Sequence, residues 1–373
     1  MAAGAVTAQW GMRTFVKSAV TAATLLFPFA IYALPASAAG TGSASTAGAV
    51  VAEVAPIEGY VWGWQPANPN YIASTGYEHN SAGGSVQITR SAVGTYQVRF
   101  AGMAGPGGAA HVSAYGNNNL CSVSSWGPSL GDEVINLRCF TTAGAPTDSR
   151  FIAHVTNRTD GASRGYLWSS DPTPPVGGYT PPTQYSFDST GQPITVAATG
   201  VGAYTVDLGA FGQDSGGLWA SGALRVTAYG SSPAHCQAFD PAAFADPEIL
   251  RVRCYGPDGL AVNTRFVLSY TRQVVPISAT VDNHAIPPTV AAWTSPGGAP
   301  TVSLLAEGDY LVSFPAAGMP GGHAFAGIVG TPPMYCVIQS WTVNAGAMNL
   351  HVRCFAPGGD ANPGMLVNIG YFN

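Results

Sequence analysis

Apolar and polar residues alternate over three short segments that resemble one another. The segments read YQVRF at 96–100, YTVDL at 204–208 and YLVSF at 310–314. In each, positions one, three and five are apolar, and the residues between them are mostly polar. A period of two is typical of a β-strand with one buried face and one solvated face. Each segment is therefore predicted to be a strand whose tyrosine points into a core.

A second alternating segment ends at a cysteine in each part of the chain. Apolar residues occupy every second position of 135–139, 250–254 and 350–354 and share a predicted face with the final cysteine. The opposite face carries an arginine each time: Arg138, Arg253 and Arg353. Such arginines could bind an anionic ligand. Pairing with a nearby carboxylate, or stacking on the aromatic residue that follows, is favoured.

These segments belong to a unit of about 106 residues that occurs three times. A turn sequence recurs as NSAGG, DSTGQ and TSPGG, and a tyrosine follows its first glycine by 13 residues each time. With about seven or eight strands, each unit suits an antiparallel sandwich. The predicted fold class is all-β: three tandem β-sandwich units, jelly-roll or Ig-like, each with one within-unit disulfide. Short connections favour units packed end to end or around a pseudo-threefold axis.

Composition shifts and the repeats set the predicted boundaries. Residues 1–38 are predicted to be a signal peptide, and the Gly/Ser/Ala-rich residues 39–56 a flexible lead-in. The three sandwich repeats are assigned to 57–160, 161–273 and 274–373.

The first forty residues have the pattern of a secretory leader. Arg13 and Lys17 precede an apolar run that Pro35 breaks, and small residues follow, with cleavage expected after Ala38. The alternative is a membrane anchor, but the run is at the short limit for spanning a bilayer. The mature protein is therefore expected to be secreted and extracellular, with no membrane attachment.

The mature charge argues against nucleic acid as a partner. The leader holds two of the 14 basic residues and no acids, which leaves 12 arginines against 19 carboxylates, a balance of −7. A surface that neutralises phosphates needs clustered basic residues. No nucleic-acid partner is expected.

Six cysteines form three pairs, and the two members of each pair are 18 positions apart. An even number in an exported chain favours disulfides, and the alternating pattern brings the two members face to face across a hairpin. Metal sites in proteins group Cys or His at shorter spacing, so no metal is expected. The predicted disulfides are Cys121–Cys139, Cys236–Cys254 and Cys336–Cys354.

No catalytic constellation emerges from the remaining residues. GQDSGG at 212–217 resembles the nucleophile loop of trypsin-like serine proteases, but it falls on a glycine-rich turn that lacks serine in the other units, so Ser215 is not assigned a role. The seven histidines fall mostly at non-equivalent places, and no acidic pair is kept across the units. The chain is predicted to be non-catalytic and to need no cofactor. The alternative is a secreted hydrolase with its site between repeats.

The hairpins that open units one and two are rich in aromatic residues. Exposed aromatic faces stack on sugar rings or hold polymer and protein surfaces. The alternative is that these rings plug the ends of the sandwiches. The candidate ligand-binding residues are Trp62, Trp64, Tyr71, Trp168 and Tyr179.

The repeated elements also carry a resemblance. The combination of GY-x-W, NS-x-GG, G-x-Y-x-V-x-F, AYG and C-x17-C is similar to a tandem-repeat family of bacterial secreted proteins for which little function is known. It covers nearly the whole mature chain, although unit three departs from GY-x-W and AYG. The resemblance implies export and repetition. The sequence thus predicts a secreted binding or structural protein whose partner is an extracellular glycan, a cell-surface polymer or a protein.

Overall fold

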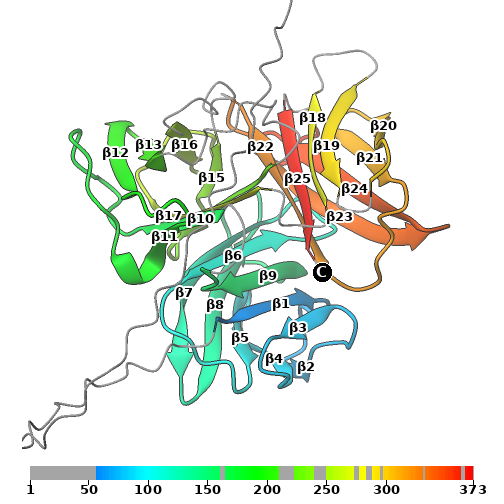
Figure 1. Ribbon diagram of the computed structural model, residues 1–373, viewed down its shortest axis with the longest axis horizontal. Coiled ribbons are helices and arrows are strands. Elements are labelled where there is room, and N and C mark those ends of the chain that lie inside the picture. Colours follow the sequence, from blue (N-terminus) through cyan, green and yellow to red (C-terminus); the bar gives the residue numbers. More distant parts are fainter. Residues whose placement is uncertain are drawn as a thin grey trace, which may run out of the picture. The chain divides into compact units, whose positions relative to one another are not determined.

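The computed structural model describes residues 56–159, 164–209, 222–238, 249–272, 277–282, 288–294, 297–330, 332–362 and 366–372 (Figure 1). The predicted signal peptide and all but the last residue of the lead-in lie outside this part of the chain. The described residues form strands, with one 3-10 turn, η1 (Thr183–Tyr185), among them. They include no helix long and apolar enough to cross a membrane.

Each of the three units is a sandwich of two antiparallel sheets, as the sequence predicts (Figure 1). We call the sheet that contains the first and last strands of a unit its inner sheet, and the other its outer sheet. In spatial order the inner sheets are β3 (Glu78–Asn80), β1 (Glu58–Gly63), β9 (Phe151–Thr156) and β6 (Ala109–Ala114); β11 (Ser186–Asp188), β10 (Arg164–Ser169), β17 (Arg265–Arg272) and β14 (Gly222–Tyr229); and β19 (Thr289–Thr294), β18 (Ile277–Asp282), β25 (Leu366–Phe372) and β22 (His323–Val329).

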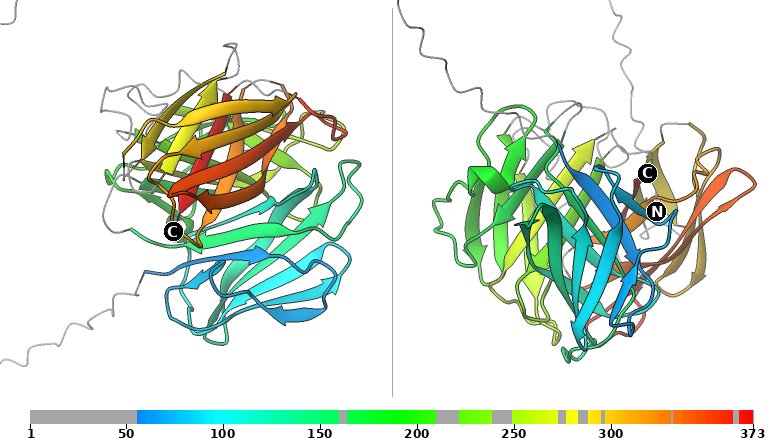
Figure 2. Two further views of the ribbon diagram at one scale, coloured as in Figure 1. Left: turned by 90° about the vertical axis from the view of Figure 1, so that its right-hand side faces the viewer. Right: turned by 90° about the horizontal axis from the view of Figure 1, so that it is seen from below.

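The outer sheets carry the disulfide hairpins. In spatial order they are β2 (Asn70–Ile72), β4 (Val86–Ala92), β5 (Thr95–Phe100), β8 (Asp132–Phe140) and β7 (Leu120–Ser129); β12 (Thr195–Gly200), β13 (Ala203–Asp207), β16 (Ile249–Tyr255) and β15 (His235–Ala238); and β20 (Thr301–Ala306), β21 (Asp309–Phe314), β24 (Ala347–Phe355) and β23 (Tyr335–Asn344). The two sheets of unit three lie one over the other in Figure 2.

The two kinds of sheet differ in burial. Strands β5, β13 and β21 alternate between buried and half-buried residues, which confirms the pattern read from the sequence. Strands β6, β9 and β25 of the inner sheets are buried over almost their whole length. A strand buried throughout is covered on both faces. The inner sheets therefore face their own sandwich core on one side and other units on the other side.

The three predicted disulfides are present. Each joins directly opposite residues of a hairpin, with Cα–Cα distances of 4.1, 4.0 and 4.0 Å. In the first hairpin the pairing follows the cysteine spacing from Cys121 to Val123. A β-bulge between Val123 and Ser125 then shifts the pairing by one residue, so the turn is formed by Leu130 and Gly131. The equal spacing of the second cysteine pair predicts a turn centred at Ala245, and this position lies outside the described residues.

The G-x-Y sequence has a structural role in units one and two. Gly94 has φ +65°, and a Cβ there would lie 2.4 Å from the Cys139 carbonyl oxygen. Two residues later the Tyr96 hydroxyl donates to the Pro66 carbonyl and accepts from the Ser149 N–H, each at 3.0 Å. The Tyr204 hydroxyl makes the equivalent bonds in unit two. These residues fix the fold of each unit and are occupied in doing so.

The three units contact one another in a closed cycle. Strands β6, β14 and β22 each end at a parallel bridge to a disulfide hairpin of another unit. The bridged pairs are Tyr115 with Ile338, Tyr229 with Val123, and Val329 with Ala238. The glycine that follows donates its N–H across each bridge, at 2.8 to 3.0 Å. The AYG element and its IVG counterpart thus form backbone contacts between units. Of the two arrangements open from the sequence, the pseudo-threefold one is present.

The predicted boundaries at 160/161 and 273/274 fall in segments outside the described residues, so they stay predictions. The arginine prediction has one clear outcome. The Arg353 guanidinium lies 5.4 Å from the centre of the Phe355 ring, so it stacks on the aromatic residue that follows.

Candidate functional site

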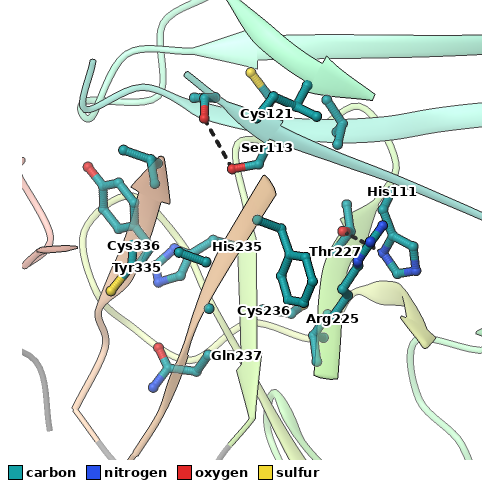
Figure 3. A pocket seen from close by; sticks show the side chains of 18 of the residues that line it. His111, Ser113, Cys121, Arg225, Thr227, His235, Cys236, Gln237, Tyr335 and Cys336 are labelled. Atoms are coloured by element: carbon teal, nitrogen blue, oxygen red, sulfur yellow. Dashed lines mark hydrogen bonds between the residues drawn. The ribbon is translucent and has the colours of Figure 1, made fainter. Parts of the chain in front are cut away.

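A cavity of about 110 Å³ lies where the three units meet (Figure 3). Its walls come from strands β6, β9, β14 and β22 of the inner sheets and from the first half of each disulfide hairpin. Cys121, Cys236 and Cys336 all line it. Much of the wall is apolar. The described residues that line the cavity include four histidines and one arginine, and no aspartate or glutamate.

The alternation of the inner strands decides which side chains reach this junction. In β6, Ala110 and Val112 point into the core of unit one, so His111 and Ser113 point the other way. The bridges between units make Arg225 and Phe325 the counterparts of His111 in units two and three. Three different side chains thus occupy one repeated position. A wall built from one repeat therefore presents different chemistry from each side.

Arg225 is the cation of the junction. Arg225 is only 7% exposed, and its guanidinium carbon lies 4.3 Å from the centre of the Phe325 ring and 3.8 Å from that of the Phe372 ring. One nitrogen, Nη2, lies 3.1 Å from Nε2 of His323. No carboxylate among the described residues contacts it, and burial lowers its pKa to about 9. A buried charge without a counter-ion is costly to fold.

His323 and His154 stack beside this arginine, with ring centres 4.8 Å apart. An arginine only donates hydrogen bonds, so Nε2 of His323 accepts from it and the proton of the neutral ring lies on Nδ1. That Nδ1 is buried and has no hydrogen-bond partner among the described residues. His154 comes from unit one and lies 3.6 Å from Glu58. The three units each contribute one of these polar groups.

The nearest acid is already engaged. Glu58 accepts a hydrogen bond of 3.0 Å from Arg158. Burial by itself would raise the pKa of Glu58, but the nearby His154 and Arg158 side chains lower it to about 2. Its negative charge is paired with Arg158 at the edge of the junction. It raises the pKa of Arg225 through space but does not contact the guanidinium, and burial outweighs it.

His111 joins units one and two. Its Nδ1 lies 2.9 Å from the Thr227 hydroxyl and its Nε2 2.7 Å from the Ser269 hydroxyl. A hydroxyl beside an imidazole is the start of a nucleophile–base pair, but the third partner here is a second hydroxyl and not a carboxylate. The same ring therefore serves as a buried link between two units.

The other side of the cavity holds His235 and Gln237 (Figure 3). Gln237 is fully engaged: it donates to the Gly330 and Pro332 carbonyls and accepts from the Met334 N–H. Neither ring nitrogen of His235 has a hydrogen-bond partner among the described residues. Burial lowers its pKa to about 4. The counterparts of His235 in units one and three are Leu120 and Tyr335, so a histidine occurs at this repeated position only in unit two.

All four histidines are held in the neutral form. Burial is the main cause and lowers the pKa of His154 to about 4 and those of His111 and His323 well below the ordinary value. The charge of Arg225 acts in the same direction on all three. At neutral pH the junction therefore holds one full positive charge and several neutral hydrogen-bonding groups.

Two of the residues predicted to bind a ligand lie in aromatic clusters between units. Trp168 of unit two contacts Trp126 of unit one, with ring centres 6.0 Å apart, and Tyr185 and Tyr229 complete that cluster. The same arrangement recurs between units one and three, where Trp62, Tyr77 and Tyr115 surround Trp341. The repeated GY-x-W tryptophan thus contacts the tryptophan that follows the first cysteine of another unit. It fills an interface between two units, an environment that was not weighed from the sequence.

The other three predicted residues lie away from the cavity. Trp64 is 39% exposed, beside Tyr71 at 6.2 Å between ring centres. Tyr71 and Tyr179 are half-buried, and the Tyr179 hydroxyl accepts from the Asp171 N–H. No single site brings the five candidates together. Ser215 and its loop lie outside the described residues.

Sequence reasoning missed the histidine–arginine junction. His111 and Arg225 occupy one repeated position with different side chains, His154 and His323 fall elsewhere in the repeat, and no short motif contains two of these residues. One signal was available: a single basic or imidazole side chain interrupts the otherwise apolar strands FIAHV and GALRV. Such a residue is buried with the strand and needs an explanation.

Comparison of the chain with family models, with curated proteins and with solved structures gave no match. The described residues contain no group of three or more His, Cys, Asp or Glu side chains placed to hold a metal ion. The junction is therefore interpreted from its own geometry.

Proposed function

We propose that this protein is a secreted, non-catalytic binding protein of the extracellular space that holds a small molecule in the cavity between its three units. The observation that carries the proposal is the chemistry of that cavity. Protein interiors are close-packed, and buried polar groups are normally hydrogen-bonded. Here a space of about 110 Å³ is bordered by a buried arginine that no carboxylate among the described residues contacts. Concave, mostly apolar sites with a few polar groups are typical of ligand pockets.

Secretion remains part of the proposal. Three disulfides are typical of oxidising compartments, and they agree with the leader predicted from residues 1–38. The resemblance to bacterial secreted tandem-repeat proteins supports the same conclusion. A fractionation experiment tests it, since the exported protein should be recovered outside the cell without residues 1–38.

The binding proposal is tested by filling the cavity. Gly327 lines it, and a Cβ at this position would meet only the Leu224 carbonyl oxygen, at 3.9 Å. Gly327→Leu should therefore fold and occupy the space. Gly177→Leu is a matched control, because a Cβ there meets nothing within 4 Å. A thermal-shift screen of small metabolites should find compounds that stabilise the wild type and Gly177→Leu but not Gly327→Leu. If no compound distinguishes the variants, the proposal is wrong.

The hydrolase alternative has one candidate pair in this cavity, His111 and Thr227. Turnover of small esters that Thr227→Val abolishes would favour it over a binding role. We expect no turnover, because no carboxylate orients the imidazole.

A second candidate function, binding of a glycan or cell-surface polymer, is favoured by the exposed rings of unit one. Trp64 and Tyr77 are each 39% exposed, and Ile72, which lies between them in the sequence, is 57% exposed. Stacking of a sugar on Trp64 should quench its fluorescence. Titration with oligosaccharides, compared with Trp64→Ala, tests this function separately from the cavity.

A further inference from the structure

Arg225 and the imidazoles around it define which class of molecule the cavity can accept. This inference rests on the proposed function and deepens it. An arginine presents five N–H donors and accepts no hydrogen bond. The one hydrogen bond of Arg225 within the described residues is the 3.1 Å contact from Nη2 to His323. The other donors of this buried cation are unused.

The cation is also held in place. The ring centres of Phe325 and Phe372 lie 4.3 and 3.8 Å from the guanidinium carbon, so this planar group of donors is held against two aromatic rings. Gly370 makes room for this packing, because a Cβ there would lie 2.2 Å from the Phe325 ring. A planar donor edge of this kind matches the two oxygens of a carboxylate.

Charge and size restrict the occupant further. The described residues lining the cavity include no acid, so the bound group itself must supply the negative charge. A cavity of about 150 Å³ holds six carbon atoms, so a space of about 110 Å³ suits about four or five non-hydrogen atoms. Apolar wall residues such as Ala326 and Val337 favour a short hydrocarbon part over a second charge.

We propose that the cavity binds a short-chain monocarboxylate, with its carboxylate on Arg225 and its alkyl group against the apolar wall. The anion supplies the counter-ion that the fold does not. Placed on the guanidinium edge, it also lies beside the stacked His154 and His323 rings. The interaction joins residues from all three units, so the ligand also ties the units together.

The test is calorimetric titration of the disulfide-bonded protein with acetate, propionate and butyrate, and with the matching alcohols 1-propanol and 1-butanol. We expect the carboxylates to bind at least about tenfold more tightly than the alcohols, as charge-assisted hydrogen bonds allow. Arg225→Met should lose this preference. Arg138→Met, an exposed arginine on an outer sheet, should keep it.

The outcomes separate this inference from the proposed function. If alcohols bind as well as carboxylates, and Gly327→Leu abolishes both, the cavity binds ligands but the carboxylate assignment is wrong. If chloride or phosphate binds in place of carboxylates, the assignment is also wrong. If nothing binds the wild type, both proposals fail. Retained thermal stability of Arg225→Met shows that its loss of binding is not unfolding.

Discussion

The Nη2 atom of Arg225 lies 3.1 Å from Nε2 of His323, and among the described residues no carboxylate contacts that guanidinium. The two residues are 98 positions apart and belong to different units. Their contact exists because the inner sheets of the units meet. A cation is thereby placed in the interior without the acid that would normally accompany it.

The first prediction concerns the stability of this arrangement. Replacing buried ionic groups with apolar residues often stabilises a protein by about 1–4 kcal/mol. Arg225→Met keeps the length of the side chain and its contact with two rings while removing the charge. We expect a free energy of unfolding higher by an amount in that range, measured by chemical denaturation at pH 7.5. Arg138→Met should change stability little, and an equal gain in both variants would contradict the explanation.

The second prediction concerns acid. His154 and His235 have pKa values near 4 in the folded protein, against about 6.5 in an unfolded chain. The unfolded state therefore binds more protons between these pH values, and stability falls as pH falls from about 6.5 towards 4. His111 and His323 act in the same direction.

A variant borrowed from another unit isolates one histidine. His235→Leu installs the residue found at the counterpart position Leu120 and removes one titrating group. Its denaturation midpoint should fall less steeply between pH 6.5 and 4 than that of the wild type. An unchanged slope for His235→Leu would mean that its ring is not held neutral.

The third prediction concerns a carboxyl group whose effect on stability has the opposite pH dependence. Glu133 is fully buried and its Oε1 has no hydrogen-bond partner among the described residues. Burial raises its pKa to about 8. The folded state therefore binds more protons than the unfolded state between about pH 4.5 and 8, so this group lowers stability as pH rises through that range.

Substitution of Glu133 by Gln should remove this dependence. In thermal melts, the melting temperature of the variant relative to that of the wild type is expected to rise from pH 5 to pH 8.5. Its neighbour Asp132 is a contrast, because the Gly102 N–H and Arg99 lower its pKa. Asp132→Asn should instead lose the stability that the ionised group contributes above its ordinary pKa. Parallel curves for Glu133→Gln and wild type would refute the assignment.

The fourth prediction concerns the aromatic interfaces. Trp341 is 8% exposed and its indole donates to the Gly321 carbonyl at 3.2 Å. Truncating a buried tryptophan costs about 3–5 kcal/mol. Trp341→Ala should lose stability in this range, and the half-buried Trp126→Ala somewhat less. Trp64→Ala, at an exposed ring, should cost under about 1 kcal/mol. Equal losses at all three positions in urea denaturation would argue against the interface role.

The fifth prediction concerns the disulfides. Closing a loop of this length stabilises a fold by about 3 kcal/mol in the chain-entropy description. Replacing Cys121 and Cys139 together with alanine should cost about that much. Non-reducing peptide mapping should recover three linkages, each between cysteines 18 positions apart. Recovery of a linkage between two different units would contradict the structure.

Local pattern was sufficient for the parts of the fold that repeat. Alternation placed Tyr96 and Cys139 in a core, and the constant cysteine spacing gave the hairpin register, because both depend on neighbours along a strand or across one turn. The tryptophans were ambiguous. An aromatic ring on a half-buried strand looks the same whether it faces solvent or Trp341 of another unit, and only the partner decides.

By itself the sequence determined an all-β chain of three sandwiches, each with one internal disulfide, since a period of two and a fixed spacing are local properties. The tertiary structure alone decided the cavity. His111, Arg225 and His323 are far apart in sequence and come from different units, so no local pattern joins them. They meet because the AYG contacts close the cycle of units. What differs between the repeats is thereby gathered at the junction they share.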